Sequence, residues 1–568
     1  MNVRRIAALH PSPFGLTSPK LRRVSVFALL PLAAGWACRT SRQAAAPAGS
    51  QAVSINVDVQ QNRHPISPLV YGINYGKELA ALNSPLNRMG GNSTTRYNWK
   101  QNADNRGNDW FFQSIADASP TPGERADTFV RQSRTAGSTP MITIPLIGYV
   151  ASVNSDRSKR WAFSVAKYGP QQKTDAQYCP DAGNGFKPDG KTLVTGNNPL
   201  DANIPAGPDF MQPWVSHLTQ TFGPTSGNKG VGYYLLDNEP ALWNSTHRDV
   251  FPNGVTMDDL ANRMETTARM IKSVDAGAKV CGPEEWGWTG YLYSAADSQW
   301  AGKNGWNAAE MPDRKTHNGM DIAPYLLRRM AQAQKQTRKR LLDVFTLHFY
   351  PQGGESTDDV SAATQAKRNR STRALWDTAY NDESWIKEKV MLIPRMKAWV
   401  AQEYPGTRIG LTEYSWGAEN HINGATAQAD ILGILGREGM DLATRWVCPD
   451  PKTPTFKAFQ MYRNYDGKNS TFGSTSVACA VPNPDDVSAF AAQTETGTVT
   501  VMIVAKAATG SRQVTVDLSH FTPSLSARAY QLTAANHIDS LPNVPINGGK
   551  LSLTVPAPSV TLVVVGRK

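Results

Sequence analysis

Two glutamates each follow an apolar run that has the character of a buried strand. In "GVGYYLLDNEPALWN" the apolar residues 231–236 give way to Asp237, Asn238 and Glu239, and "RIGLTEYSWG" places Glu413 in the same way. Either glutamate alone is equally consistent with a helix cap or a surface charge. At the ends of two parallel barrel strands, however, they would face each other across one mouth. Such a pair suits hydrolysis of a glycosidic bond, and a retaining enzyme holds the two carboxyl groups ~5–5.5 Å apart.

The surrounding sequence supplies the elements that must position these glutamates. Short apolar runs alternate with amphipathic segments of helical period, which is typical of a (β/α)8 barrel. Glu239 then ends the fourth strand and Glu413 the seventh, so they lie on opposite sides of the barrel mouth. We expect the barrel to cover residues 66–470. Its strands are expected at 69–74, 87–90, 141–150, 231–236, 279–282, 342–350, 408–412 and 441–446, and its helices at 124–136, 209–222, 258–274, 323–341, 385–404, 426–437 and 455–465.

The carboxy-terminal residues show period-two alternation without helices, which predicts a β-sandwich over residues 471–568. The early segment "AVSINVDVQQN" alternates in the same way, with Val53, Ile55, Val57 and Val59 on one face. We expect residues 52–65 to contribute a strand to this sandwich; a separate strand at the base of the barrel is the alternative. Because tryptophan is scarce in the β domain, we expect it to support the barrel structurally, with a carbohydrate-binding module as the alternative.

The amino-terminal residues have the layout of an export signal. Lys20, Arg22 and Arg23 precede the apolar run "VSVFALLPLAAGWA", and small residues follow to about position 51. Residues 1–51 are therefore expected to be a signal and linker, and the mature protein to be secreted to the periplasm or the extracellular space. Cys38 is a candidate lipoprotein anchor. No further apolar run has membrane-spanning length, so we expect no transmembrane segment in the mature protein.

Composition excludes several other classes of function. The chain has 568 residues and a net charge of +12, but its basic residues are scattered without a recognition motif, which argues against nucleic-acid binding. Cys179, Cys281, Cys448 and Cys479 have no CxxC spacing, so a zinc site is not expected. The spacing leaves open one or two disulfides, or buried free thiols.

Five ordered blocks carry a resemblance to a known family. "RMGGNSTTRYNW", "YYLLDNEPALWNSTHRDVFP", "GPEEWGW", "LHFYPQ" and "LTEYSWGAENHINGATAQADILGILGREGM" resemble glycoside hydrolase family 44, bacterial endoglucanases and xyloglucanases of the barrel-glycosidase clan. The resemblance extends from about residue 52 to the end and departs at Met89 and Trp416, which puts subsite preference in doubt. It implies that Glu239 is the general acid/base and Glu413 the nucleophile.

Further residues at strand ends are expected to bind substrate or to support the two glutamates. We expect Asn238 to contact the sugar 2-hydroxyl and Arg88 to keep the nucleophile ionised. Asn92 is in reach of sugar or carboxylate, and His348 or Tyr350 is placed to hydrogen-bond the nucleophile. The aromatic residues expected to stack on pyranose rings are Trp243, Trp286, Trp288 and Trp416.

The sequence as a whole predicts a monomeric, retaining endo-β-1,4-glucanase that acts on cellulose-type glucans or xyloglucan without an organic cofactor. Long loops at 92–122 and 152–208 would wall an open groove. The second loop carries Asp175, Asp181 and Asp189, candidates for structural calcium, although a solvated loop is the plainer interpretation. The alternatives are a xylanase or mannanase on the same scaffold, or a carbohydrate-binding protein without activity.

Overall fold

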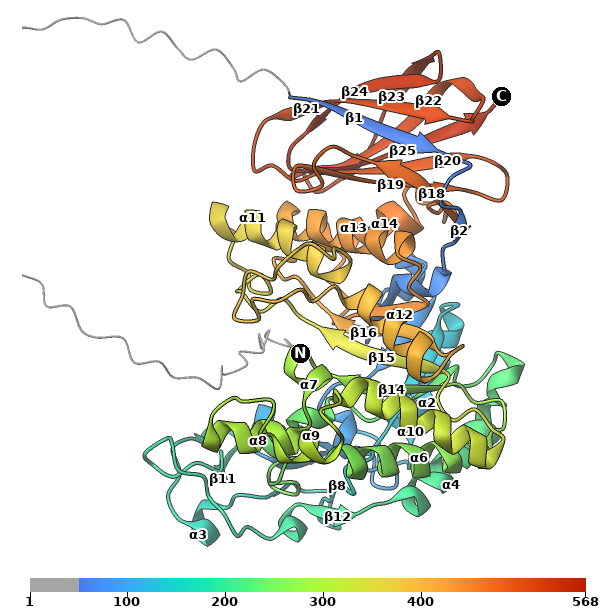
Figure 1. Ribbon diagram of the computed structural model, residues 1–568. Coiled ribbons are helices and arrows are strands. Elements are labelled where there is room, and N and C mark those ends of the chain that lie inside the picture. Colours follow the sequence, from blue (N-terminus) through green and yellow to red (C-terminus); the bar gives the residue numbers. More distant parts are fainter. Residues whose placement is uncertain (1–50) are drawn as a thin grey trace, which may run out of the picture. The chain divides into compact units, whose positions relative to one another are not determined.

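The computed structural model describes residues 51–568, which form one compact unit (Figure 1). The expected export signal and Cys38 lie outside the described residues. Within the described chain, no helix combines the length and apolar character needed to cross a membrane.

Eight parallel strands close into a barrel, which confirms the predicted fold class. Around the barrel, β13 pairs with β7 and β14, and β17 pairs with β3 to close the ring. The interior is lined by buried side chains such as Leu86, Met141 and Leu235, so the barrel is a packed core whose open positions are at the strand ends. The strands are β3 (Gly72–Asn74), β4 (Leu86–Met89), β7 (Thr139–Ile144), β13 (Tyr233–Leu236), β14 (Val280–Glu285), β15 (Val344–Phe349), β16 (Arg408–Tyr414) and β17 (Leu442–Arg445).

The helices of the barrel follow the amphipathic segments of the sequence. Six of the seven begin and end close to the expected residues, and Thr256 caps α6 by accepting a hydrogen bond from the Asp259 N–H at 3.2 Å. The principal helices are α2 (Glu124–Thr135), α4 (Pro208–Phe222), α6 (Met257–Val274), α10 (Ile322–Thr337), α12 (Leu392–Glu403), α13 (Ile422–Arg437) and α14 (Pro454–Arg463). Shorter helices are α1 (Leu79–Leu82), α3 (Val165–Tyr168), α5 (Trp243–Thr246), α7 (Trp288–Leu292), α8 (Ala295–Asn304), α9 (Pro312–Thr316) and α11 (Ala362–Ser371).

The expected helix over 385–404 was wrong in its first turns, because α12 begins only at Leu392. Lys387 and Met391 both have positive φ, which a helix does not tolerate. A helix from 385 would also place Pro394 in its interior, where proline removes a hydrogen bond and clashes with the preceding turn. In the structure Pro394 lies in the first turn, where these costs are absent.

Small strands fold the long loops after β4 and β7. The strands β5 (Ala103–Asn105), β6 (Gln113–Ala116) and β9 (Arg160–Trp161) form one small sheet, β8 (Tyr149–Ala151) pairs with β12 (Asn203–Pro205), and β10 (Thr174–Asp175) pairs with β11 (Cys179–Gly183). A separate apolar cluster that includes Phe112, Phe163 and Val194 lies beneath these loops. The loops are therefore held by cores of their own.

The carboxy-terminal residues and the first strand build the predicted sandwich (Figure 1). Strand β1 (Gln51–Asp58) runs parallel to β21 and antiparallel to β18, and Ile55 and Val57 are buried in the sandwich core. The other strands are β2 (His64–Pro65), β18 (Thr475–Ala480), β19 (Val487–Gln493), β20 (Val499–Ala505), β21 (Ser511–Ser519), β22 (Pro523–Leu532), β23 (Ile538–Asn547), β24 (Lys550–Pro556) and β25 (Ser559–Arg567).

Helix α13 joins the barrel to the sandwich. Gly433 on this helix lies against Phe490 of β19 so closely that an added Cβ would come within 2.2 Å of the ring. Beside it, buried Asp430 forms an ion pair with buried Lys506 at 2.7 Å. Phe490 also belongs to the same continuous core as the barrel helices, so the two parts share buried contacts.

Candidate active site

Glu239 lies directly after β13, on a strand end that is tightly bonded to its neighbours. Its N–H donates to the carbonyl of Glu284 on β14 at 2.9 Å, and its backbone has a positive φ of 46°. The Asp237 carboxylate accepts hydrogen bonds from Thr95 Oγ1 at 2.6 Å and from the Ile147 N–H at 3.1 Å. Burial raises the pKa of Asp237 to about 6, although these hydrogen bonds act to lower it. The strand end thus stays in a strained conformation because surrounding groups hold it.

Glu413 is the penultimate residue of β16, and each of its carboxylate oxygens accepts a hydrogen bond. Arg88 donates to Oε1 at 2.7 Å, and the Tyr350 hydroxyl donates to Oε2 at 2.9 Å. Burial, followed by the negative charges of Glu413 and Glu239, raises the pKa of the Tyr350 hydroxyl well above its ordinary value, so it remains a donor. These two donors hold the Glu413 carboxyl group in one orientation.

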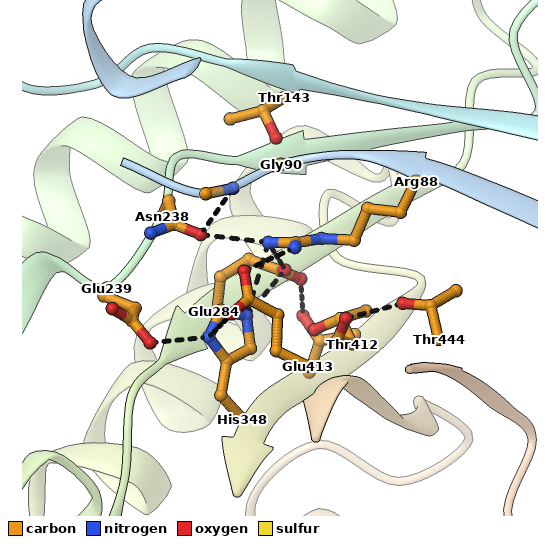
Figure 2. A network of polar contacts seen from close by, with 12 residues as sticks. Arg88, Gly90, Thr143, Asn238, Glu239, Glu284, His348, Thr412, Glu413 and Thr444 are labelled. Carbon is orange, nitrogen blue, oxygen red and sulfur yellow. Dashed lines mark hydrogen bonds and ion pairs between the residues drawn. The ribbon is translucent and has the colours of Figure 1, made fainter. Parts of the chain in front are cut away.

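His348 on β15 lies between the two glutamates (Figure 2). Its Nδ1 is 2.9 Å from Glu239 Oε1 and 3.7 Å from Glu413 Oε2. One oxygen of each glutamate and a ring nitrogen of His348 all lie within 4.8 Å of one another. Retaining glycosidases hold their two carboxyl groups ~5–5.5 Å apart, and inverting ones hold them farther apart.

Arg88 at the end of β4 is fully buried and connects four of the strand ends. Besides Glu413, it donates to Asn74 Oδ1 at 2.9 Å and to Asn238 Oδ1 at 3.1 Å, and it lies 2.9 Å from Glu284 Oε2. Burial alone would lower the pKa of Arg88, but the charges of Glu284 and Glu413 raise it above its ordinary value. The guanidinium is therefore a permanent cation in the floor of the site.

Asn238 and Asn92 extend this network toward the loops. Asn238 Oδ1 also accepts from the Gly91 N–H at 3.1 Å, and its amide nitrogen lies 3.3 Å from Asn92 Oδ1. Asn92 in turn donates to Asp109 at 2.8 Å. The structure therefore brings both asparagines next to the glutamate pair.

Two adjacent carboxylates, Glu284 and Glu285, were not among the residues that we expected in the site. Both end β14 and both are almost completely buried, but their surroundings differ. Burial would raise the pKa of Glu284, yet Arg88 and His348 lower it below the ordinary value. Glu285 has no ion-pair partner among the described residues, and burial with the nearby Glu239 charge raises its pKa to about 8. The signal in the sequence was "GPEEWGW", whose two acidic residues follow an apolar run.

Three of the four tryptophans expected to stack on sugar were placed wrongly, because their rings are buried. The Trp243 indole N–H donates to the Asn238 carbonyl at 3.2 Å, Trp288 lies under Arg395, and Trp416 donates to Ser371 at 2.9 Å. They are structural supports of the strand ends. Only Trp286 of this set is partly exposed.

Two other tryptophans are better placed to meet a polymer. Trp446 directly follows β17 and is partly exposed, and its ring packs so tightly on Gly91 that an added Cβ would lie 2.4 Å away. Trp385 is 53% exposed, and its indole N–H lies 3.4 Å from Gln352 Oε1, just beyond Tyr350. Trp446 could have been found as the residue after the eighth strand, whereas Trp385 fell inside an expected helix.

The candidate calcium ligands are not gathered in the structure. The carboxylates of Asp175, Asp181 and Asp189 are bound separately, by Gln113, by Trp161 and Ser164, and by Thr192, respectively. Among residues 51–568, the acidic and histidine side chains close enough to share an ion are Glu239, His348 and Glu413. The Arg88 cation already contacts this cluster, and both His348 nitrogens face carboxylates, so its chemistry suits proton transfer better than metal binding.

The four cysteines of the described chain are all free thiols, and two of them are buried. Of the two alternatives that the spacing left open, the structure therefore supports free thiols and not disulfides. Burial raises the pKa of the Cys281 thiol well above its ordinary value, and the negative charges of Glu284 and Asp343 act in the same direction. This thiol therefore stays protonated and unreactive at neutral pH.

Known proteins share this architecture and sequence. The sequence model of glycoside hydrolase family 44 matches residues 103–353. A solved bifunctional glucanase-xylanase from a metagenome library is 54% identical, covering 91% of this chain and 100% of its own, with a TM-score of 0.90. A family 44 xyloglucanase from Paenibacillus polymyxa, solved with xyloglucan, is 29% identical over the same shares, with a TM-score of 0.75.

A curated endoglucanase A from Paenibacillus lautus is 31% identical over 84% of this chain. The chain spans 66% of the length of that relative and 33% of a second curated relative. The agreement of family model, sequence and fold is sufficient to classify the protein: the chain belongs to glycoside hydrolase family 44.

Proposed function

We propose that the protein is a retaining endo-β-1,4-glucanase that hydrolyses internal bonds of cellulose-type glucans and xyloglucan. The observation that carries the proposal is the pair Glu239 and Glu413, whose oxygens lie within 4.8 Å at opposite strand ends of one barrel mouth. Their different partners support different roles. Glu413 accepts hydrogen bonds from two donors, whereas the side chain of Glu239 has a single histidine partner.

In the first step, Glu239 donates its proton to the oxygen of the leaving sugar while Glu413 attacks the anomeric carbon. The glycosidic bond breaks, and a covalent bond forms between that carbon and a Glu413 oxygen. Arg88 and Tyr350 keep the attacking carboxylate oriented through its two oxygens. Asn238 lies beside both groups, where its amide can bond the sugar 2-hydroxyl as the transition state develops.

In the second step, Glu239 is an anion and removes a proton from water. The resulting hydroxide attacks the anomeric carbon, and Glu413 leaves as a carboxylate again stabilised by Arg88 and Tyr350. Two inversions return the starting anomeric configuration. Trp446, Trp385 and Trp286 are the exposed faces on which neighbouring sugar rings would stack.

We further propose that the mature enzyme is secreted, acts as a monomer and needs no cofactor. Residues 66–470 would then form the catalytic domain, and residues 471–568 with 52–65 a β domain that supports it. The second candidate activity is xylan hydrolysis, which is favoured by the 54% identity to the protein described as a bifunctional glucanase-xylanase. A binding protein without activity has less support because both carboxylates and their partners are present. A mannanase has the same two carboxylates, and a relative that is 30% identical over 77% of this chain is named beta-mannanase/endoglucanase A.

The two catalytic roles predict different behaviour in matched variants. Glu239→Gln is expected to lose ~10²–10⁴-fold activity on glucan but to keep reacting with aryl glycosides whose leaving group needs no proton. Added azide should then accelerate turnover and give the β-glycosyl azide. Glu413→Gln loses both activities, and a shortened Glu413→Gly variant should yield the α-glycosyl azide. Azide products of the opposite configuration would exchange the two roles.

The substrate class is tested separately on purified polymers. We expect wild-type enzyme to release reducing sugar from xyloglucan and carboxymethyl cellulose, with the β-anomer appearing first by NMR. Xylan and glucomannan are included in the same panel. Release from glucomannan alone, or an initial α-anomer, would contradict the proposal.

A further inference from the structure

Glu284 is a third carboxylate in the floor of the site, and no step of the proposed mechanism uses it. Its side chain is fully buried between β14 and β15, beyond the reach of a sugar. Arg88 Nη2 lies 2.9 Å from its Oε2, His348 Nε2 lies 3.3 Å from the same oxygen, and Thr346 Oγ1 donates to its Oε1. A buried charge with three such partners is held in one position.

The contacts of His348 Nε2 bear on its protonation. Arg88 Nη2 donates to Asn238 Oδ1 at 3.1 Å, and its 2.9 Å approach to Glu284 Oε2 is an ion pair. His348 Nε2 lies 3.3 Å from Arg88 Nη2 and 3.3 Å from Glu284 Oε2, in hydrogen-bonding geometry to each. A protonated Nε2 donates to the Glu284 carboxylate, so the Glu284 anion favours the proton on this nitrogen.

The other ring nitrogen of His348 faces Glu239. When Glu239 is ionised, Nδ1 also needs a proton to donate across the 2.9 Å contact. The histidine is then an imidazolium that bridges two carboxylates, in the order Glu284, His348, Glu239 (Figure 2). The charged and titratable groups that face it are Glu239 after β13, Glu284 on β14, Glu413 on β16 and Arg88 on β4, with Glu285 as the neighbour beyond.

We propose that Glu284 is a positioning residue for the acid/base carboxyl group: it keeps His348 doubly protonated, and His348 in turn orients Glu239 and stabilises its anionic form. The proposal rests on the function proposed above. Its consequence for catalysis is that the anion left on Glu239 after the first step finds a cation already in place. The same cation limits how far into the alkaline range Glu239 keeps its proton.

The sign of the effect follows from the distances. Without the Glu284 charge, His348 loses the anion at Nε2 and becomes neutral at lower pH. The nearest cation to Glu239, at 2.9 Å, is then absent, whereas the lost anion lies farther away on the other side of the ring. Glu239 should therefore retain its proton to higher pH.

The test compares Glu284→Gln with Glu285→Gln. The control replaces the next residue along the chain, which is equally buried and also a carboxyl group, but forms no ion pair or hydrogen bond with Arg88 or His348. His348 protonation is followed by NMR of its ring nitrogens, and the alkaline limb of kcat/KM is measured on a soluble glucan. In Glu284→Gln we expect the pKa of His348 to fall from about 9 by at least about one unit, and the alkaline limb to move up by about one pH unit. In Glu285→Gln both shifts should be smaller, because Glu285 acts on His348 and Glu239 only through space.

A second variant protects the test against misfolding. Thr346→Val perturbs the surroundings of Glu284 by removing one hydrogen bond but keeps its charge, so neither readout should move in the direction expected for Glu284→Gln. An unchanged His348 titration in folded Glu284→Gln would overturn the inference, as would equal shifts in Thr346→Val or Glu285→Gln. These results leave the proposed function intact, because that is judged separately from the products that the wild-type enzyme releases from the polymers.

Discussion

Replacing Glu285 with glutamine should stabilise the protein at neutral pH, although the residue lies beside the catalytic centre. Glu285 is 1% exposed, its Oε1 has no hydrogen-bond partner among the described residues, and its Oε2 is 3.4 Å from the Ala241 N–H. Burial is the main reason that its pKa rises from 4.5 to about 8, and the Glu239 charge adds to the rise. The folded protein therefore holds a proton at pH 7 that the unfolded chain releases.

The magnitude follows from this difference in proton binding. Because the pKa is raised in the folded state, the stability from Glu285 is complete below pH 4.5 and is lost as the pH rises toward 8. At pH 7, which is about 2.5 pH units above the unfolded pKa, the free energy of unfolding has fallen by about 3 kcal/mol; at pH 5 it has fallen by less than about 1 kcal/mol. Glutamine has nearly the same shape and no charge to lose. Any cost of burying its amide is the same at both pH values.

The assay is urea unfolding of the wild type and of Glu285→Gln at pH 5 and pH 7. The stability of the variant relative to the wild type should increase by about 2–3 kcal/mol between these pH values. A relative stability that is the same at both would refute the reasoning, because it would mean that Glu285 is ionised in the folded protein. The activity of the variant at its optimum serves as the control for an intact site.

The remaining predictions concern the barrel mouth and the junction with the β domain. Tyr350→Phe removes a hydrogen bond to the Glu413 charge worth about 1.5–3 kcal/mol, so kcat on glucan should fall about 10–100-fold in the folded variant; a loss below about threefold would contradict the role of the hydroxyl. His348→Gln should remove a pH dependence of stability. Burial would lower the pKa of His348, but the charges of Glu413 and the other carboxylates outweigh it and raise the pKa to about 9. The free energy of unfolding of the wild type, measured with urea, should therefore fall by up to about 3 kcal/mol between pH 6.5 and 9, and that of the variant should not show this fall. Lys506→Met leaves the Asp430 carboxylate buried without its cation and should lower the free energy of unfolding by about 3–5 kcal/mol. Adding Asp430→Leu to the same chain should restore most of this loss. If the single variant unfolds like the wild type, this ion pair has no structural role at the junction.

The elements of this fold were largely predictable because their periodicity is local. Alternation at Val53 to Val59 identified a strand, and the apolar runs before Glu239 and Glu413 identified strand ends. Within the sandwich the signal varies: polar residues and prolines interrupt the alternation in β23, whereas β24, "KLSLTVP", alternates regularly. Residues near Trp385 were mistaken for helix because a helical spacing of apolar residues does not reveal the positive φ values that end it.

The sequence by itself determined which strand ends carry the two glutamates, since a parallel barrel places all such ends at one mouth. It also indicated Arg88, Asn238, His348 and Tyr350, because polar residues in apolar strands need partners. Only the tertiary structure decided that Glu284 is charged and Glu285 neutral, although they are adjacent and equally buried: successive side chains of a strand point to opposite sides, and only one side holds Arg88 and His348. Only the tertiary structure, likewise, separates the buried Trp243, Trp288 and Trp416 from Trp286, Trp385 and Trp446, which keep part of their surface exposed.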